Sequence, residues 1–252
     1  MVAPAEMTTV FDMVRHLFPM LPLLALLASP VEIAKAGPPY NTDDPGIPDR
    51  GQIDLYLFTT GTIDESGGTF GLELNYALTE DIQLTADVPM ERDVGLPVAR
   101  AALGNSELAV KYRFIRQANF GWDAAMVPRL FLPSFAAGGT KMFVPIWIGK
   151  NYDKWSTFGG GGCTVDWTNG GKNYCFAGWA GTYQVAHSLS LGMEIYRQGA
   201  DASRAHSSTG LGLGLQYAAG KGIQLLTALE PNFEDVTGET QVGWHMSVLL
   251  SF

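Results

Sequence analysis

The sequence predicts an all-β fold: a transmembrane, antiparallel, up-and-down β-barrel of the bacterial outer-membrane type with about twelve strands. Three observations predict it. Hydropathy alternates with a period of two along most of the chain after residue 50. Gly accounts for 30 of 252 residues while charged residues make up only 16%, which favours tightly turned strands over helices. The last alternating segment ends on an aromatic residue, Phe252.

Residues 1–36 are predicted to be a signal peptide. The apolar run from Leu17 to Val31 is short and interrupted by prolines, so it is a poor transmembrane helix. Ala34 and Ala36 supply the small residues at the −3 and −1 positions of a cleavage site, which predicts a mature chain starting at Gly37. The alternative is a buried hydrophobic helix of the mature protein.

The period of two is clearest near the end of the chain, where apolar residues occupy every second position. A soluble sandwich also alternates, but here the second face is rich in Gly, Ser and charge, as a small polar lumen would be. Alternation also appears in residues 70–77, 107–114, 189–196 and 210–217. The apolar face of the last segment comprises Val242, Trp244, Met246, Val248, Leu250 and Phe252; the other comprises Gly243, His245, Ser247, Leu249 and Ser251.

These patterns predict twelve strands, although ten or fourteen remain open. The least regular is 141–150, which has no polar face. Short connections at 79–80, 117–118, 187 and 220–221 should be periplasmic, and longer ones at 91–103, 198–206 and 233–239 extracellular. An even count then places both termini in the periplasm. The strands are 51–62, 68–78, 81–90, 104–116, 119–133, 141–150, 155–166, 173–186, 188–197, 207–219, 222–232 and 240–252.

Aromatic residues near strand ends or on the apolar face are expected to form girdles at the two membrane interfaces. They are Tyr76, Tyr112, Trp122, Trp147, Trp155, Tyr217 and Trp244. The terminal Phe252 resembles the signal that the outer-membrane assembly machinery recognises, so that machinery and outer-membrane lipid are the expected partners.

The two cysteines, Cys163 and Cys175, flank an Asn169-Gly170 turn signal and would lie opposite each other in a hairpin. A secreted chain meets an oxidising compartment, so a disulfide is expected; the alternative is two unpaired small residues. The chain has no CxxC and no metal-ligand spacing, and we expect no metal site and no cofactor.

Ionisable residues on the polar face are the candidate lumen lining. Because charges at membrane depth need a partner or water, we expect Lys111, Arg113 and Arg129 to meet acidic groups across the lumen. They could line a selective polar path or form a structural ion-pair network in a closed lumen. The candidate lining residues are Glu73, Lys111, Arg113, Asp123, Arg129, Glu194, Glu230 and His245, with Asp54, Asp87 and Glu107 on the same face; the expected acidic partners are Glu73, Asp123, Glu194 and Glu230.

Residues 37–50, here called the leader, contain four prolines and cannot form a strand interior. They could be an ordered plug or periplasmic collar, with Asp43 and Asp44 capping a turn, or a disordered tether. The matching positions Ala36 to Pro39 and Thr42 to Pro45 make this segment resemble the start of the outer-membrane proteins grouped as the MetA-pathway of phenol degradation family. That resemblance implies one barrel involved in uptake of small, including aromatic, compounds.

The expected function is therefore an outer-membrane channel or transporter for passive passage of small solutes, including hydrophobic or aromatic ones, and not an enzyme. The net charge of −9 argues against a nucleic-acid partner. One alternative is a structural barrel with a plugged lumen. The second is an outer-membrane hydrolase, for which the candidates are His245 with Ser247 in the last strand, or Asp201, His206 and Asp235 in the loops.

Overall fold

The computed structural model describes residues 39–252 apart from 64–66, 94–99, 135–138, 169 and 202–205. The predicted signal peptide, its cleavage residues Ala34 and Ala36, and Asn169 of the predicted turn lie outside the described residues. The first strands are β1 (Ile53–Thr62), β2 (Gly68–Ala77), β3 (Ile82–Asp93), β4 (Arg100–Leu103) and β5 (Ser106–Ile115). A single helical turn, α2 (Gln117–Phe120), precedes β6 (Asp123–Met126) and β7 (Arg129–Leu132).

The second half of the described chain is a run of long strands joined by alternating turns and loops. They are β8 (Lys141–Tyr152), β9 (Trp155–Asp166), β10 (Tyr174–Ala186), β11 (Leu189–Gln198), β12 (Ser208–Gly220), β13 (Ile223–Glu234) and β14 (Thr240–Ser251). No helix among the described residues is long and apolar enough to cross a membrane.

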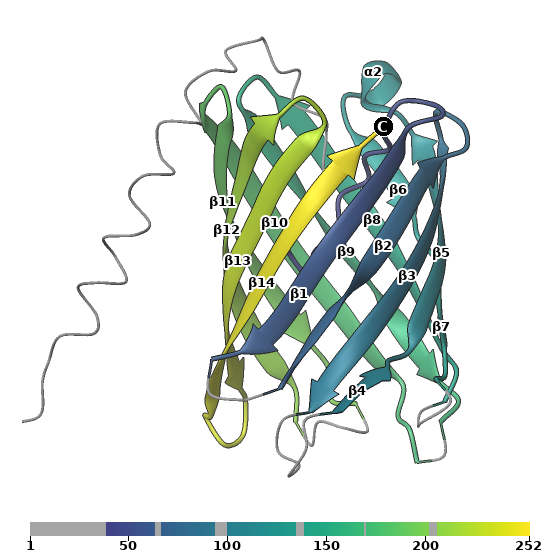
Figure 1. Cartoon of the computed structure of the whole chain (residues 1–252), viewed down its shortest axis with the longest axis vertical. Helices are drawn as coiled ribbons and strands as arrows, with labels where there is room; N and C mark the ends of the chain where they lie inside the picture. The colour runs from purple at the N-terminus through teal and green to yellow at the C-terminus, as the bar shows by residue number, and fades with distance from the viewer. Residues whose placement is uncertain (1–38, 64–66, 94–99, 135–138, 169, 202–205) are drawn as a thin grey trace, which may run out of the picture. The chain divides into compact units, whose positions relative to one another are not determined.

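All of these strands belong to one antiparallel sheet that closes on itself (Figure 1). β14 pairs with β1 from Asp54–Ser251 to Thr62–Gly243, and β3 pairs with β5, so the ring has no break. β6 and β7 together occupy the one position between β5 and β8. β4 pairs with the end of β3 and so continues the position that β5 occupies beside the rest of β3. The described strands therefore occupy twelve positions, which confirms the predicted twelve-stranded barrel.

Two predicted segments differ from the structure in detail. Residues 119–122 are not strand: α2 and Gly121 occupy the connection from Arg116 to Trp122, so the predicted short turn at 117–118 is wrong. The strand that follows is interrupted at Val127 and Pro128, because Pro128 has no backbone N–H to donate to a ladder. Its carbonyl still accepts the N–H of Val110, which holds the wall together there.

The alternation of faces is confirmed along the strands. In β12, Gly210, Gly212 and Gly214 are buried whereas Leu211 and Leu213 are exposed on the outer face. In β14, Ser247 and Leu249 are buried while Met246 is exposed. An apolar exterior around a largely polar interior is the pattern of a barrel that sits in lipid.

The strand predicted at 141–150 lacks a polar face because its inner face packs against other apolar groups. Trp147 is fully buried inside the barrel, where its ring meets Phe143 and Phe176 at edge-to-face angles with centroids 6.5 and 6.2 Å away. Trp147 is therefore wrongly assigned to an aromatic girdle. Tyr76, Tyr112, Trp122 and Trp155 are exposed, in keeping with the girdle assignment.

The two ends of the barrel differ in their connections. At the end here called the turn end lie 78–81, 116–122, 153–154, 187–188 and 221–222, together with the start of β1 and the end of β14. The C-terminus and α2 both lie at this end, and β4 lies at the other, the loop end (Figure 1). Backbone hydrogen bonds between Phe252 and Ile53, 2.9 and 3.1 Å long, finish the β1–β14 seam, and the Phe252 ring is exposed.

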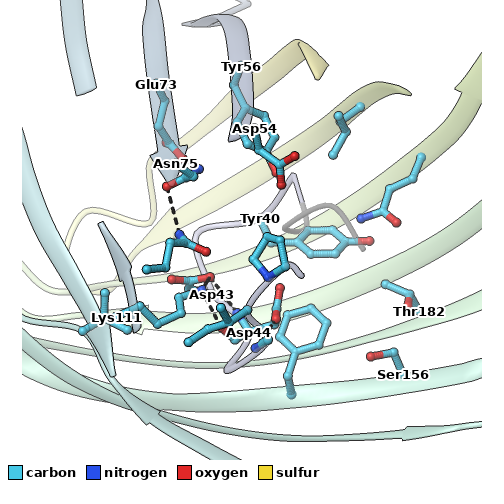
Figure 2. A pocket seen from close by; sticks show the side chains of 18 of the residues that line it. Tyr40, Asp43, Asp44, Asp54, Tyr56, Glu73, Asn75, Lys111, Ser156 and Thr182 are labelled. Carbon is cyan, nitrogen blue, oxygen red and sulfur yellow. Dashed lines mark hydrogen bonds and ion pairs between the residues drawn. The ribbon is translucent and has the colours of Figure 1, made fainter. Parts of the chain in front are cut away.

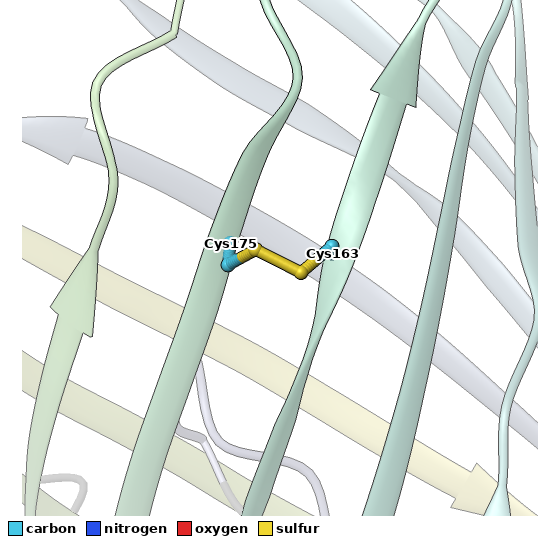
Figure 3. Close-up of a disulfide and its surroundings, with 2 residues drawn as sticks. All are labelled: Cys163 and Cys175. Atoms are coloured by element: carbon cyan, nitrogen blue, oxygen red, sulfur yellow. A yellow bond between two sulfur atoms is a disulfide. The ribbon is translucent and has the colours of Figure 1, made fainter.

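The only two cysteines of the sequence are Cys163 on β9 and Cys175 on β10, which are direct cross-strand partners joined by a disulfide (Figure 3). Both side chains lie on the outer face of the barrel, since their neighbours Thr164 and Phe176 point inward and Val165 points outward. The bond therefore links two strands near the loop end without entering the lumen.

Candidate functional site: the barrel lumen

The interior of the barrel holds two cavities. One, of about 730 Å³, is lined by residues of the turn-end half and the middle of the barrel, from Asp54 and Lys154 to Phe58 and Glu107. The other, of about 770 Å³, is lined mainly by residues closer to the loop end, such as Thr62, Glu91 and Glu230. The lumen of a barrel with about twelve strands is too wide for the side chains of the wall to fill completely, so open space of this size is expected.

The leader lies inside this lumen, between strands on opposite sides. On one side Asp43 meets two cations: Lys111 Nζ lies 3.0 Å from Asp43 Oδ1, and Arg129 Nη2 lies 2.7 Å from Asp43 Oδ2 (Figure 2). Lys111 Nζ also donates to the backbone carbonyl of Asp44 at 2.8 Å. Arg129 Nη1 lies 3.7 Å from Glu107.

We call this side the ionic wall. It comprises Glu73 on β2, Asp87 on β3, Glu107 and Lys111 on β5, and Arg129 on β7. Burial would raise the pKa of the Asp43 carboxyl, but Lys111 and Arg129 outweigh burial and hold that pKa below its usual range. Asp43 is therefore an ionised side chain placed between two cations, and the leader carries the anion that the ionic wall needs.

On the other side, the leader is held by close packing and by hydrogen bonds that its uncharged N–H groups donate. The backbone N–H groups of Asn41 and Thr42 donate to the Glu194 carboxylate at 3.1 and 3.0 Å. The Asn41 side-chain amide donates to Glu230 at 3.0 Å. Thr42 is fully buried.

Three glycines on neighbouring strands make room for these leader residues, and we call them the glycine wall: Gly178 on β10, Gly192 on β11 and Gly214 on β12. A Cβ on Gly178 would overlap the Thr42 hydroxyl, and a Cβ on Gly192 or Gly214 would overlap the Tyr40 ring or its hydroxyl. Burial, then the nearby Glu194, raises the pKa of Tyr40, so its phenol stays neutral.

The leader itself is turned by its own carboxylates. Asp43 Oδ1 accepts the N–H of Asp44 at 2.8 Å, and Asp44 Oδ1 accepts the N–H of Gly46. Pro45 then packs where Gly149 leaves space on β8. Such side-chain-capped turns fix a short segment without regular secondary structure.

Three further candidate lining residues, Glu73, Arg113 and Asp123, have hydrogen-bond or ion-pair partners on their own strand, on a neighbouring strand or on a turn. Glu73 accepts from Asn75 at 2.6 Å, and Asn75 accepts in turn from Gln83 at 2.9 Å (Figure 2). Arg113 lies 3.5 Å from Asp81 and 3.9 Å from Asp123 at the turn end. The expected pairing of Arg113 with Asp123 is thus present, whereas Lys111 and Arg129 pair with Asp43 rather than with Glu73, Glu194 or Glu230, because the leader comes between the walls.

A second ionic cluster ties the turns together at the turn end. Arg116 binds both carboxylate oxygens of Asp81 and lies 2.8 Å from Glu80. The hydrogen bonds from Arg116 lower the pKa of Asp81. Beside it, Asp123 accepts the first N–H of α2 from Gln117 at 2.8 Å, which positions the helical turn over the rim.

The structure shows the partners of three of the groups considered for hydrolysis, His245, Ser247 and Asp235. His245 Nε2 lies 3.2 Å from Ser247 Oγ and both line the lumen, but no hydrogen bond joins His245 to a carboxylate there. Asp235 in the β13–β14 loop is bound by Arg197, which lowers the pKa of the Asp235 carboxyl.

The structure thus brings seven of the eight candidate lining residues to the cavities and places the eighth, Glu194, under the leader. Sequence reasoning missed the leader residues Tyr40, Asn41, Thr42 and Asp43 as their partners. One feature of the sequence could have indicated them. Gly at successive inward positions of β12 leaves space in the lumen, which another segment of the chain can fill.

Comparisons place this barrel among known structures. The "Crystal structure of the COG4313 outer membrane channel from Pseudomonas putida F1" matches with a TM-score of 0.65 and 16% identity, covering 82% of this chain and 97% of that one. The "KdgM porin" matches with a TM-score of 0.59 and 11% identity over 79% of this chain and 99% of that one. The "NanC porin" gives 0.59 and 9% over 78% and 98%. No curated protein sequence matches the chain.

Fold and lumen together define an outer-membrane β-barrel with a porin-like architecture. The family model described as "Putative MetA-pathway of phenol degradation" matches residues 36–250. The chain belongs to that family, as the resemblance of its leader predicted.

Proposed function

We propose that this protein is a passive outer-membrane channel for small solutes, with the leader acting as an internal plug that narrows the lumen. The observation that carries the proposal is that cavity space lies on both sides of the leader and not on one alone. A barrel with a purely structural role does not need two open cavities inside it. The channel fold of the similar structures supports the same role.

The cavity lining supports passage of small solutes with mixed character. The turn-end cavity combines hydroxyl and amide groups, such as Thr182 and Gln184, with the rings of Tyr56, Phe58 and Phe158. Aromatic faces bind apolar or aromatic solutes while the polar groups replace lost water. We therefore propose that small aromatic compounds pass as well as small polar ones.

The orientation follows the same proposal. The short turns and both ends of the barrel sheet lie at the turn end, which supports a periplasmic turn end and a loop end outside the cell. Outer-membrane lipid then surrounds the apolar exterior, and the barrel-assembly machinery inserts the chain.

Liposome swelling tests the channel role directly. Proteoliposomes containing the refolded chain should swell in neutral solutes up to a sharp size limit, and empty liposomes should not. A series of neutral aromatic and non-aromatic solutes of matched size would show whether the rings favour aromatic cargo. Absence of swelling for every solute, with the barrel folded by its heat-modifiable mobility, would instead favour the structural, plugged barrel.

A further inference from the structure

The two lumen cavities have four residues in common: Tyr40 and Asn41 from the leader, Thr60 from β1 and His245 from β14. Space on the turn-end side and space on the loop-end side therefore adjoin at this group of residues. We call it the junction. A solute that moves from one of these cavities to the other at this point passes the junction.

The junction has one fixed side and one side supplied by the leader. Thr60 and His245 are direct cross-strand partners on β1 and β14, so the barrel wall holds them together. His245 is further held by Ser247, 3.2 Å away. Opposite them, Tyr40 is seated against Gly192 and Gly214, and Asn41 is bound to β11 and β13 through Glu194 and Glu230.

Two acidic side chains lie close to the junction, and neither has a cation beside it among the described residues. The Asn41 amide reaches both Glu230, at 3.0 Å, and Glu194, at 3.4 Å, so two carboxylates lie around one neutral group. In the part of the chain that the structure describes, no Lys or Arg forms an ion pair with Glu194 or Glu230.

The two cations of the ionic wall are occupied elsewhere. Lys111 is neutralised by Asp43, and Arg129 by Asp43 and Glu107, on the opposite wall. A narrow place in a low-dielectric wall concentrates the field of an unbalanced charge, and carboxylates at such places favour cations in channels.

We propose that the junction of Tyr40, Asn41, Thr60 and His245, with Glu230 beside it, determines both the size limit and the charge preference of the path. Inorganic cations and small solutes with a cationic group pass ahead of anions. This inference rests on the proposed channel function and adds its specificity determinants.

The charge preference is tested by the reversal potential of single channels in a KCl gradient. The wild-type chain should prefer K⁺ to Cl⁻. Glu230→Gln keeps an acceptor for Asn41 and should lower the permeability ratio by roughly threefold or more. Glu239→Gln removes the same charge from an exposed loop residue that lines neither cavity, and should change the ratio little.

The size limit is tested on neighbouring residues of one strand. Thr60→Phe adds a ring at the junction and should lower conductance several-fold. Thr59→Phe adds the same ring on the outer face of β1, where it meets lipid, and should leave conductance unchanged.

The outcomes separate this inference from the channel function itself. A conducting channel that prefers anions, or one in which neither Glu230→Gln nor Thr60→Phe differs from its control, overturns the junction as specificity determinant and leaves the channel in place. Absence of current from the wild-type chain and from a leader deletion would overturn the proposed function, and the inference with it.

Discussion

The ionic wall and the glycine wall hold the same leader by different means. The ionic wall binds Asp43 through two cations, in a place where each charge has been removed from bulk water. The glycine wall leaves space for Tyr40 and Thr42, and beside it the Glu194 carboxylate accepts the N–H groups of Asn41 and Thr42. Attachment to the first wall depends on the charge of Asp43, and attachment to the second depends on shape and on hydrogen bonds from neutral donors.

The largest effect should follow removal of the Asp43 charge. Asp43→Asn leaves Lys111 and Arg129 without their shared anion, and breaking a buried pair costs about 3–5 kcal/mol. We expect the leader to leave its place, single-channel conductance to rise several-fold, and the swelling size limit to increase. Asp49→Asn changes an exposed leader carboxylate and should leave all three unchanged. Wild-type conductance in Asp43→Asn would mean that the ionic wall does not retain the leader.

A smaller effect is expected at the glycine wall. Gly214→Ala places a methyl group where the Tyr40 ring lies, so the ring must move and conductance should rise moderately. Gly220→Ala, on the same strand, meets nothing within 4 Å and serves as the control. If Asp43→Asn and Gly214→Ala both act by releasing the leader, the double variant should conduct no more than Asp43→Asn alone. Fully additive changes would indicate two separate effects.

Protonation of Asp43 should loosen the ionic wall. The pKa of Asp43 is lower in the attached leader than the usual value of about 3.9. Its ion pairs are therefore complete above that value and are lost as the pH falls through the lower, attached-state pKa. The part of the size limit for neutral solutes that depends on Asp43 should be constant from neutral pH to about 4 and rise below it.

Other carboxylates also lie near the leader: Glu73 from β2, Glu107 from β5 and, on the opposite side, Glu194 from β11. Asp43→Asn separates them, since the part of the acid-dependent rise that comes from Asp43 should be absent in that variant. A rise that persists in Asp43→Asn belongs to these other carboxylates.

The smallest effect on conductance should come from the disulfide, which lies on the outer face and touches neither wall. Replacing Cys163 and Cys175 by Ser should lower the free energy of unfolding by about 2–3 kcal/mol, because the closed loop is short. Single-channel conductance should not change. A change would mean that the β9–β10 hairpin shapes the lumen.

The fold could be predicted closely from the sequence because alternation records which side of a strand meets lipid. The β12 pattern of Gly and Leu gave both faces of that strand correctly. Pattern failed where one residue overrides it: Pro128 interrupts its strand, and Trp147 turns inward into an aromatic cluster that no local pattern indicates.

From the sequence, the residues that line the lumen could be predicted, but their partners could not. Lys111 and Arg129 belong to the inner face by alternation alone, but their partner Asp43 lies in a segment without periodicity, far away in the sequence. Pairing across a lumen depends on how the leader folds back, and a period of two carries no information on that.

If the leader narrows an otherwise open barrel, its removal should widen the path, and single-channel conductance measures that width. The refolded chain should be compared with a form lacking residues 39–48, which retains the Asp49–Gln52 turn before β1. Steady current is expected in both forms, several-fold larger in the shortened one. Equal conductance in the two forms, or no current in either, would show that the leader does not narrow an open barrel.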